Sequence, residues 1–388
     1  MFRYVIVGAG FAGSVIAERI AKTLNEKVLV IDKRHHIGGN CYDEKEENGI
    51  ILHKYGPHLF HTPYYEVVRY LENFTKFETY QHRVLGYIDG KKVPIPFNFT
   101  SLETLFPKEL SEIIKKKLLE KYELDQRIPI LELIDSEDEH IRKFANFVYE
   151  KVFKNYTAKQ WSKKPEEIDK TVTARVPVVI GYDDRYFSDK YQFVPVNGYT
   201  EIFTNLLKTP NIKLMLNTSF KEIGSVGDEG IRIFGKKFKG VLIYTGAIDE
   251  LFNYKFGYLN YRTLKLDFEV VDKEYFQEVS VVNYPNDYDF TRITEFKHIH
   301  KPKVSVNKTV ILKEYPKEYD PKQDIQYYPF FDDPSREAYN KYLDIAKKYK
   351  NLLLVGRLAE YKYYDMDDIV KRALDVFENE IARTKSRK

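Results

Sequence analysis

Several residue types are scarce in this chain, and each scarcity narrows what the protein can be. The 388 residues include one cysteine, Cys41, so no disulfide can form within the chain and a reducing compartment fits. No apolar run is long enough to span a membrane. The N-terminal MFRYVIVGAG breaks into glycines after a short apolar run, unlike a secretory signal peptide. We therefore expect a cytoplasmic protein with no membrane partner.

The chain also carries little net charge. The chain carries 62 basic and 58 acidic residues, a formal net charge of +4, and no stretch has a dense basic run. This argues against a nucleic-acid partner. Tryptophan occurs once, at Trp161, whereas Tyr occurs 32 times and Phe 26 times. Most of these aromatics will fill the core, but Tyr has a flat apolar face and a polar tip, which suits a cleft for a polar ligand.

A glycine motif near the N-terminus predicts a dinucleotide site. YVIVG predicts a strand, FAGSVIAERIAKTL a helix and KVLVID a second strand, so residues 3–31 form a βαβ unit. Gly8 to Gly13, GAGFAG, is a GxGxxG motif between the first strand and the helix, and the second strand ends at Asp32. The glycines let backbone N–H groups approach a pyrophosphate, and the Asp32 carboxylate is spaced to reach the ribose hydroxyls. These residues alone leave NAD and FAD open.

A second glycine loop bears on the choice of cofactor. KRHHIGGN follows Asp32 directly and suits close backbone approach to an extended cofactor. The whole run VIVGAGFAGSVIAERIAKTLNEKVLVIDKRHHIGGN resembles the fingerprint of FAD-containing amine-oxidase-like flavoproteins. This resemblance implies FAD.

We predict an α/β fold: a doubly wound FAD-binding Rossmann-like domain with an inserted helical domain and an inserted antiparallel β-sheet domain. GVLIYTG and NLLLVGR predict further buried parallel strands, residues 101–160 have helical periodicity, and residues 186–345 have strand-like composition. The predicted FAD-binding domain takes residues 1–75, 190–250 and 345–388. The mostly helical domain with a lid takes residues 76–180, and the substrate domain with its sheet takes residues 181–189 and 251–344.

Two shorter stretches suggest what surrounds the cofactor. YGPHLFHT places His58 and His61 three apart, but HxxH alone is poor support for a metal, and we predict no metal site. Structural histidines and histidines lining a flavin or sugar pocket both remain open. In VGRLAEYKYYDMDD a strand ends at glycine and a helix opens near Asp365. We expect that helix N-terminus to stabilise negative charge on a reduced flavin.

Motifs along nearly the whole chain resemble one family, the UDP-galactopyranose mutases. They occur in the family's order: HKYGPHLFHT, PIPFN, NYTAKQW, YFSDKYQFVPVNGYTEIF, YTGAIDELFNYKFGYLNYRTL, FTRITEF, KEYP and GRLAEYKYYDM. GRLAEYKYYDM and KQW are the most specific, and the segment 101–153 is the least matched. The resemblance implies an isomerase that interconverts UDP-galactopyranose and UDP-galactofuranose with FAD in its reduced form. The N5 atom of the reduced flavin would form a covalent adduct with the sugar's anomeric carbon.

The resemblance also implies a set of site residues. The implied catalytic residues are Arg175, Arg292, Arg357 and His61. The implied cofactor-binding residues are Gly8, Gly10, Phe11, Ala12, Gly13, Asp32, Lys33, Arg34, Gly39, Asn40, His58, Leu59, Arg357, Asp365 and Met366. The implied substrate-binding residues are His82, Tyr156, Thr157, Trp161, Arg175, Tyr186, Arg262, Asn283, Arg292, Tyr315, Tyr363 and Asp365. Arginine suits the diphosphate leaving group because its planar fork matches phosphate oxygens.

The same resemblance implies partners and leaves alternatives. A UDP-sugar would be the substrate, an external reductant such as NAD(P)H would keep the flavin reduced, and a homodimer is possible. A lid would lie around Arg175–Tyr182. Three alternatives stay open: the same chemistry on UDP-N-acetylgalactosamine, an amine-oxidase-like flavin oxidase, and a binding protein without catalysis.

Overall fold

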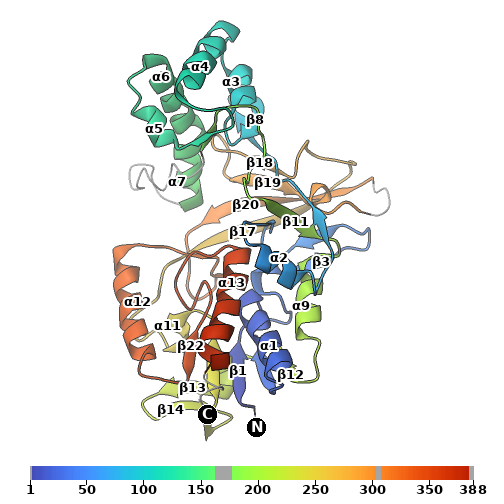
Figure 1. Cartoon of the computed structure of the whole chain (residues 1–388), viewed down its shortest axis with the longest axis vertical. Coiled ribbons are helices and arrows are strands. Elements are labelled where there is room, and N and C mark those ends of the chain that lie inside the picture. The colour runs from blue at the N-terminus through green and yellow to red at the C-terminus, as the bar shows by residue number, and fades with distance from the viewer. Residues whose placement is uncertain (1, 162–176, 303–306, 384–388) are drawn as a thin grey trace.

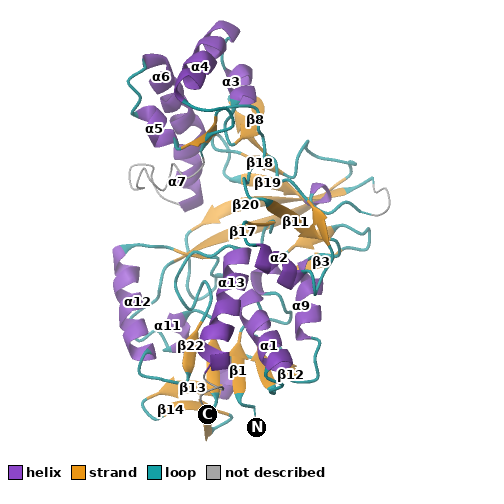
Figure 2. Cartoon of the chain, in the orientation of Figure 1, coloured by secondary structure: helices purple, strands orange, loops and turns teal. Residues whose placement is uncertain are grey.

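The computed structural model describes residues 2–161, 177–302 and 307–383, and everything below refers to these ranges. In Figure 1, a parallel sheet with its helices forms the lower part of the molecule, a larger sheet crosses the middle, and a helical insert stands at the top. Figure 2 shows that strands dominate the middle and helices the top. In the described ranges, no helix combines the length and apolar character that crossing a membrane would need.

The lower part is a doubly wound parallel sheet. Its strands, in spatial order, are β12 (Ile212–Met215), β2 (Val28–Ile31), β1 (Tyr4–Val7), β16 (Val241–Tyr244) and β22 (Leu352–Leu354). Alternate residues face opposite sides: Tyr4 and Ile6 join one buried cluster, whereas Val5 joins another. Burial on both faces explains why these strands are continuous apolar runs. The sheet has the predicted doubly wound arrangement.

Helices cover both faces of this sheet. Helices α1 (Phe11–Thr23), α2 (Tyr65–Leu71), α9 (Tyr199–Leu207) and α13 (Met366–Val376) contribute to the cluster on one face. Helices α10 (Phe220–Ile223), α11 (Ile248–Leu251) and α12 (Asp333–Ala346) contribute to the cluster on the other. Helix α1 packs so closely that a Cβ atom added to Gly13 would lie 1.9 Å from the carbonyl oxygen of Gly8. Only glycine fits that position.

The sheet across the middle has seven strands. In order they are β21 (Tyr328–Pro329), β17 (Tyr261–Val271), β20 (Thr309–Lys317), β19 (Arg292–Glu295), β18 (Val281–Asn283), β7 (Val84–Ile88) and β8 (Lys91–Ile95). All neighbours are antiparallel except β18 and β7. A smaller sheet of β5 (Phe60–Thr62), β11 (Tyr191–Pro195) and β6 (Phe77–Thr79) lies nearby.

Strands β7 and β8 differ from the sequence-based division, which grouped residues 76–180 with the helices. They form a hairpin whose turn residues Asp89 and Gly90 have φ angles of 47° and 80°. Positive φ at both positions is the signature of a type I′ turn, and Asp-Gly is a preferred pair for it. The Asp-Gly pair was therefore a usable sequence signal that this segment forms a β-hairpin.

The helical insert has its own core. It contains α3 (Phe99–Leu105), α4 (Lys108–Lys121), α5 (Ile130–Ile134), α6 (Glu139–Val148), a π-helical segment η2 (Tyr149–Lys154) and α7 (Asn155–Trp161). Phe97 and Phe144 are fully buried in its cluster. Pro107 separates α3 from α4, and Asn98 and Asp138 cap the starts of α3 and α6. Helix α7 extends from this insert toward the middle sheet (Figure 1).

Candidate active site

A cavity that is open to solvent, with about 1320 Å³ of empty space, lies at the carboxyl ends of the parallel strands. The glycine motif, the residues after β2, and segments after β12, β16 and β22 form its wall. Asp32 is held in place because its carboxylate accepts hydrogen bonds from the backbone N–H groups of Ala9 (2.8 Å) and Arg34 (2.9 Å). This is where doubly wound proteins bind ligands, since loops from several strands converge there.

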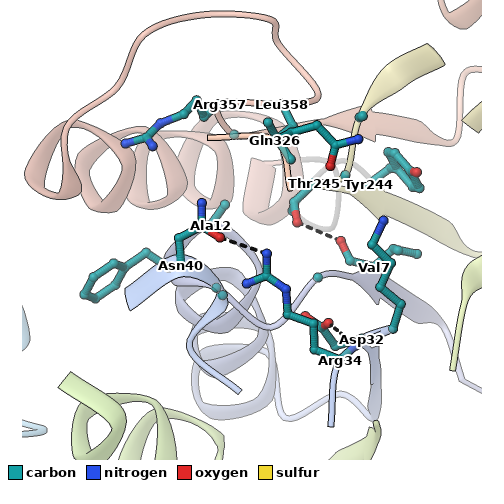
Figure 3. A pocket seen from close by; sticks show the side chains of 18 of the residues that line it. Val7, Ala12, Asp32, Arg34, Asn40, Tyr244, Thr245, Gln326, Arg357 and Leu358 are labelled. Carbon is teal, nitrogen blue, oxygen red and sulfur yellow. Dashed lines mark hydrogen bonds between the residues drawn. The ribbon is translucent and has the colours of Figure 1, made fainter. Parts of the chain in front are cut away.

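The surroundings of the Arg34 side chain test whether this cavity fits a dinucleotide. Its Nη2 donates to Asn40 Oδ1 at 2.8 Å, and its guanidinium lies 4.4 Å from the centre of the Tyr55 ring. Figure 3 shows Arg34 reaching Asn40 inside the cavity. The Nη1 atom is buried and has no hydrogen-bond partner among the described residues. A buried cationic donor that lines the same cavity as the N-terminus of α1 suits an anion, so the wall fits the pyrophosphate of a dinucleotide.

Most of the predicted cofactor residues line this cavity. They are Gly8, Gly10, Phe11, Ala12, Asp32, Lys33, Arg34, Gly39, Asn40, His58, Arg357, Asp365 and Met366. Gly13 does not line it, because its role is the close packing of α1, and Leu59 lines a second cavity. Sequence reasoning missed Thr218–Lys221, Tyr244–Ala247 and Gln326–Tyr327 in the wall. The first two segments follow β12 and β16, so the rule that parallel strands share one carboxyl edge would have found them.

A second cavity, also open to solvent and with about 990 Å³ of empty space, adjoins the first. His58, Arg357, Asp365 and Met366 line both. Arg357 is held between the two because its Nη1 donates to the Tyr327 carbonyl (3.0 Å) and its Nη2 donates to the Tyr364 carbonyl (2.6 Å). Its guanidinium also stacks 4.1 Å from the centre of the Tyr328 ring. A ligand that fills the first cavity would therefore present its far end to the second.

Arg292 is the other cation of the second cavity. Its Nε donates to Glu314 Oε1 at 2.7 Å, and the Glu314 side chain is 2% exposed. No described residue accepts a hydrogen bond from its two terminal nitrogens. Burial lowers the pKa of Arg292, but Glu314 and the nearby Tyr156 outweigh it and raise the pKa. Arg292 is thus a fixed positive charge with two donors available to an anion.

Histidines and tyrosines complete the polar wall. Burial lowers the pKa of His58 to about 4 and that of His82 to about 3, and the charge of Arg292 acts in the same direction. Both rings are therefore neutral near pH 7. Tyr156 on α7 donates to Asn283 Oδ1 at 3.2 Å, which ties the helical insert to the middle sheet. Within the described ranges, no group of His, Cys, Asp or Glu side chains is arranged to hold a metal ion.

The predicted substrate residues divide into three groups. His82, Tyr156, Tyr186, Asn283, Arg292, Tyr363 and Asp365 line the second cavity, as does the predicted catalytic residue His61. Thr157, Arg262 and Tyr315 do not line it: Thr157 is buried in α7, Arg262 lies over the Tyr328 ring, and Tyr315 lies against Phe290. Arg175, the side chain of Trp161 and part of the predicted lid lie outside the described residues.

Tyr328 is a wall residue that sequence reasoning missed. Its ring stacks on Tyr363 at 5.1 Å with an interplanar angle of 16°, and the Arg357 guanidinium lies over it. Its neighbour in the sheet is Arg262. Tyr328 stands in a stretch of the chain without a local motif, so only the pairing of β21 with β17 brings it to the cavity.

The fold and the first cavity together define a dinucleotide-binding protein of the Rossmann class with an adjoining polar cavity. Comparisons with known proteins narrow the class. Residues 151–363 match the family described as UDP-galactopyranose mutase, and residues 6–74 match the NAD(P)-binding Rossmann-like domain. The chain belongs to the UDP-galactopyranose mutase family. The resemblance and the fold class predicted from sequence are confirmed.

Individual relatives cover nearly the whole chain. A dTDP-fucopyranose mutase of Escherichia coli is 36% identical over 97% of both chains. A UDP-galactopyranose mutase of Mycoplasma pneumoniae is 31% identical over 96% of this chain and 94% of its own length. The crystal structure of a reduced UDP-galactopyranose mutase superposes with a TM-score of 0.67 and 15% identity, over 97% of this chain and 93% of that one. At that identity the structural match shows the fold alone.

Proposed function

We propose that this protein is a UDP-galactopyranose mutase, an isomerase that interconverts UDP-galactopyranose and UDP-galactofuranose with bound FAD. The observation that carries the proposal is the junction of the two cavities at Arg357, His58 and Asp365. A dinucleotide cofactor lying along the first cavity would place its reactive ring at this junction. A sugar nucleotide in the second cavity would bring its sugar to the same point. The family match supports both ligands.

The first cavity would hold FAD. The N-terminus of α1 and Arg34 would face the pyrophosphate, and Asp32 would face the adenosine ribose. When bound and reduced, the flavin supplies a nucleophilic nitrogen to a reaction with no net redox change. Asp365 is the N-cap residue of helix α13 and forms a capping box with Asp368, and this helix N-terminus adjoins both cavities. That positive helix end would stabilise negative charge on the ring.

The second cavity would hold the sugar nucleotide. Arg292 would direct its two terminal nitrogens at the diphosphate, because Glu314 occupies only Nε. The charge on the diphosphate grows as its bond to the sugar breaks, so a fixed cation there favours the transition state. Tyr156, Tyr186 and Tyr363 would add hydroxyl groups around the same ligand. Arg175 and Trp161 stay predictions of further contacts to the diphosphate and the base.

One assay tests the proposal directly. The purified protein is incubated with UDP-galactofuranose, with and without dithionite, and the sugar nucleotides are separated by chromatography. We expect conversion to the pyranose only in the reduced sample. A yellow protein that binds UDP without converting this sugar would contradict the substrate, and a protein that carries no FAD would contradict the cofactor.

A second candidate substrate is dTDP-fucopyranose. The E. coli mutase that acts on it by name is 36% identical to this chain over nearly its full length, a match as extensive as those of the galactose enzymes. The assay is therefore run in parallel with dTDP-fucofuranose and with the N-acetylated galactose nucleotide. The substrate with the highest kcat/KM is the preferred one.

Three further predictions accompany this function. Because only reduced flavin would be active, we infer an external reductant, with NAD(P)H as the first to test by anaerobic bleaching of the flavin. A homodimer is carried over from the resemblance and is tested by sedimentation. A cytoplasmic location is supported by the single free, buried thiol of Cys41 and is tested by cell fractionation.

A further inference from the structure

His61 is fixed by a carboxylate that no motif singled out. Its Nδ1 lies 2.9 Å from Asp189 Oδ2, and its ring stacks 3.7 Å from the centre of the Phe187 ring at an angle of 18°. Gln192, which pairs with His61 across β11 and β5, donates from Nε2 to the backbone carbonyls of Phe187 (3.2 Å) and Asp189 (2.9 Å). The residue opposite His61 therefore fixes the segment that carries both of its partners.

The carboxylate determines which nitrogen of His61 carries hydrogen. An ionised Asp accepts hydrogen bonds and cannot donate them, so the Nδ1 atom of His61 must be the donor. The Nε2 atom is then a bare acceptor in the neutral ring and a donor in the protonated ring. His61 lines the second cavity, and its Nε2 has no hydrogen-bond partner among the described residues. This atom is available to a ligand.

The other histidines of this cavity are held differently. His58 Nδ1 lies 2.8 Å from the Gly56 carbonyl, and His82 Nδ1 lies 3.2 Å from the Ser280 hydroxyl. Burial lowers the pKa of both, whereas neither faces a carboxylate. The arginines of the wall cannot give up a proton near neutral pH. Among the described histidines that line this cavity, His61 is the one whose ring nitrogen contacts a carboxylate.

The proposed reaction needs a group that can both take and give one proton. When a pyranose becomes a furanose, the bond from C1 to O5 breaks and the bond from C1 to O4 forms. O5 gains a proton and the O4 hydroxyl loses one, so neither protons nor electrons are gained overall. A single imidazole nitrogen near both oxygens can balance this exchange.

We propose that Asp189 is a positioning residue that holds His61 with Nε2 toward the sugar, and that this nitrogen passes the proton between O4 and O5. The proposal rests on the proposed function but not on the identity of the nucleotide or of the substituent at C6. Galactose and fucose nucleotides require the same proton exchange at O4 and O5.

A purely structural role for the pair gives different expectations. In that case the Asp189–His61 contact would only fasten the segment before β11 to β5, and its loss would lower stability without a selective effect on turnover. A positioning role predicts a fall in kcat with little change in KM, and dependence of the effect on His61 itself.

The decisive variant is Asp189→Asn, which keeps the shape and removes the charge. We expect kcat to fall by roughly 10- to 100-fold, no more than the lower end of the usual contribution of general acid–base catalysis, while KM changes less than about 3-fold and FAD stays bound. The double variant with His61→Ala should be no slower than His61→Ala alone. Asp184→Asn is the matched control: Asp184 lies in the same segment but pairs with exposed Arg83, 2.9 Å away, and should leave kcat unchanged.

A spectroscopic measurement needs no variant to be active. In oxidised holoenzyme without substrate, ¹H–¹⁵N correlation spectra of labelled histidines should show His61 with hydrogen on Nδ1, assigned by its loss in His61→Ala. Asp189→Asn should shift or remove this signal, and Asp184→Asn should not. Other charged or titratable groups near the ring, Asp367 and His82, are the same in both variants.

Each outcome has one meaning. A selective fall in kcat in Asp189→Asn, together with an Nδ1–H signal in the unmodified protein, supports the proposal. An Asp189→Asn enzyme with kcat within about 3-fold of the unmodified protein, or a His61 ring that carries hydrogen only on Nε2, overturns it. Absence of turnover in the unmodified protein with every sugar nucleotide contradicts the proposed function instead.

Discussion

The two cavities share Arg357 but are built in opposite ways. The first is formed by loops at one edge of a parallel sheet, and backbone groups hold its key carboxylate, Asp32. The second is assembled from a helix of the insert, two sheets and the junction before α13, and side-chain pairs such as Arg292–Glu314 hold its charged groups. The first is a property of local chain geometry, and the second is a property of tertiary packing.

Because backbone groups hold the first cavity together, we predict that a substitution that disturbs backbone packing will damage this cavity more than the second. Gly13→Ala would place a Cβ atom 1.9 Å from the Gly8 carbonyl oxygen, so α1 must move away from β1. We expect loss of bound FAD and destabilisation of about 1–3 kcal/mol or more. Flavin absorbance and urea unfolding measure both effects. Gly227→Ala is the control, because an added Cβ there meets no described atom within 4 Å; equal losses in both variants would contradict the argument.

A substitution in the second cavity should instead lower catalytic activity while FAD stays bound in the first cavity. In Arg292→Ala the diphosphate loses a fixed cation, and we expect kcat/KM to fall by about 100-fold or more with FAD content unchanged. Steady-state kinetics and the flavin spectrum provide the measurement. Arg83→Ala removes an exposed arginine paired with Asp184 and serves as control. Near-normal turnover in Arg292→Ala would show that Arg292 has no role in catalysis.

The buried histidines of the second cavity should make stability depend on pH. Burial lowers the pKa of His82 in the folded protein to about 3, below the ordinary value of 6.5 for a histidine. Between these values the unfolded chain binds a proton that the folded chain does not, so the free energy of unfolding falls as pH falls through this range. His82→Asn should reduce that slope by up to about 1.4 kcal/mol per pH unit. Urea unfolding at several pH values tests this, with the exposed His140→Asn as reference.

The smallest expected effect concerns the thiol of Cys41, which lines the first cavity. Burial raises the pKa of Cys41 to about 12, so little thiolate exists near neutral pH. We expect iodoacetamide to label the native protein far more slowly than the urea-unfolded chain. Mass spectrometry of the alkylated protein measures both rates. Equal rates would show that the first cavity opens readily and would weaken the contrast between the cavities.

The contrast also explains how much the sequence could predict. The βαβ unit, the glycine motif and Asp32 lie within one local stretch, so elementary periodicity placed the first cavity and the parallel sheet. Tyr328 and Glu314 could not be placed in this way. Only the pairing of β21 with β17 brings Tyr328 to the second cavity, and only the pairing of β19 with β20 sets Glu314 beside Arg292. Asp189 lies within the motif YFSDKYQFVPVNGYTEIF but was given no role, since its partner His61 is 128 residues away in the chain.

Arg262, Thr157 and Tyr315 show a different limit of the sequence. The family resemblance implies that they bind substrate, whereas in this structure they do not line the second cavity, so their role stays a prediction. A resemblance transfers positions along the chain but not the direction in which a side chain points. The Asp89-Gly90 pair is a strong local signal for a β-hairpin. The helical composition of the residues that follow outweighed this signal when residues 76–180 were assigned to the helical domain.

The order of strands in the parallel sheet has a consequence for biosynthesis. Strand β22, near the end of the chain, pairs with β16, and α13 packs on α1, which forms near the beginning. The segment 355–366 also completes both cavities. A nascent chain that has emerged only as far as residue 350 therefore has the glycine motif but no closed cofactor site. Closure of the cofactor site therefore requires synthesis through residue 366, and until β22 is made the half-built sheet has an unpaired β16 edge that is prone to aggregation.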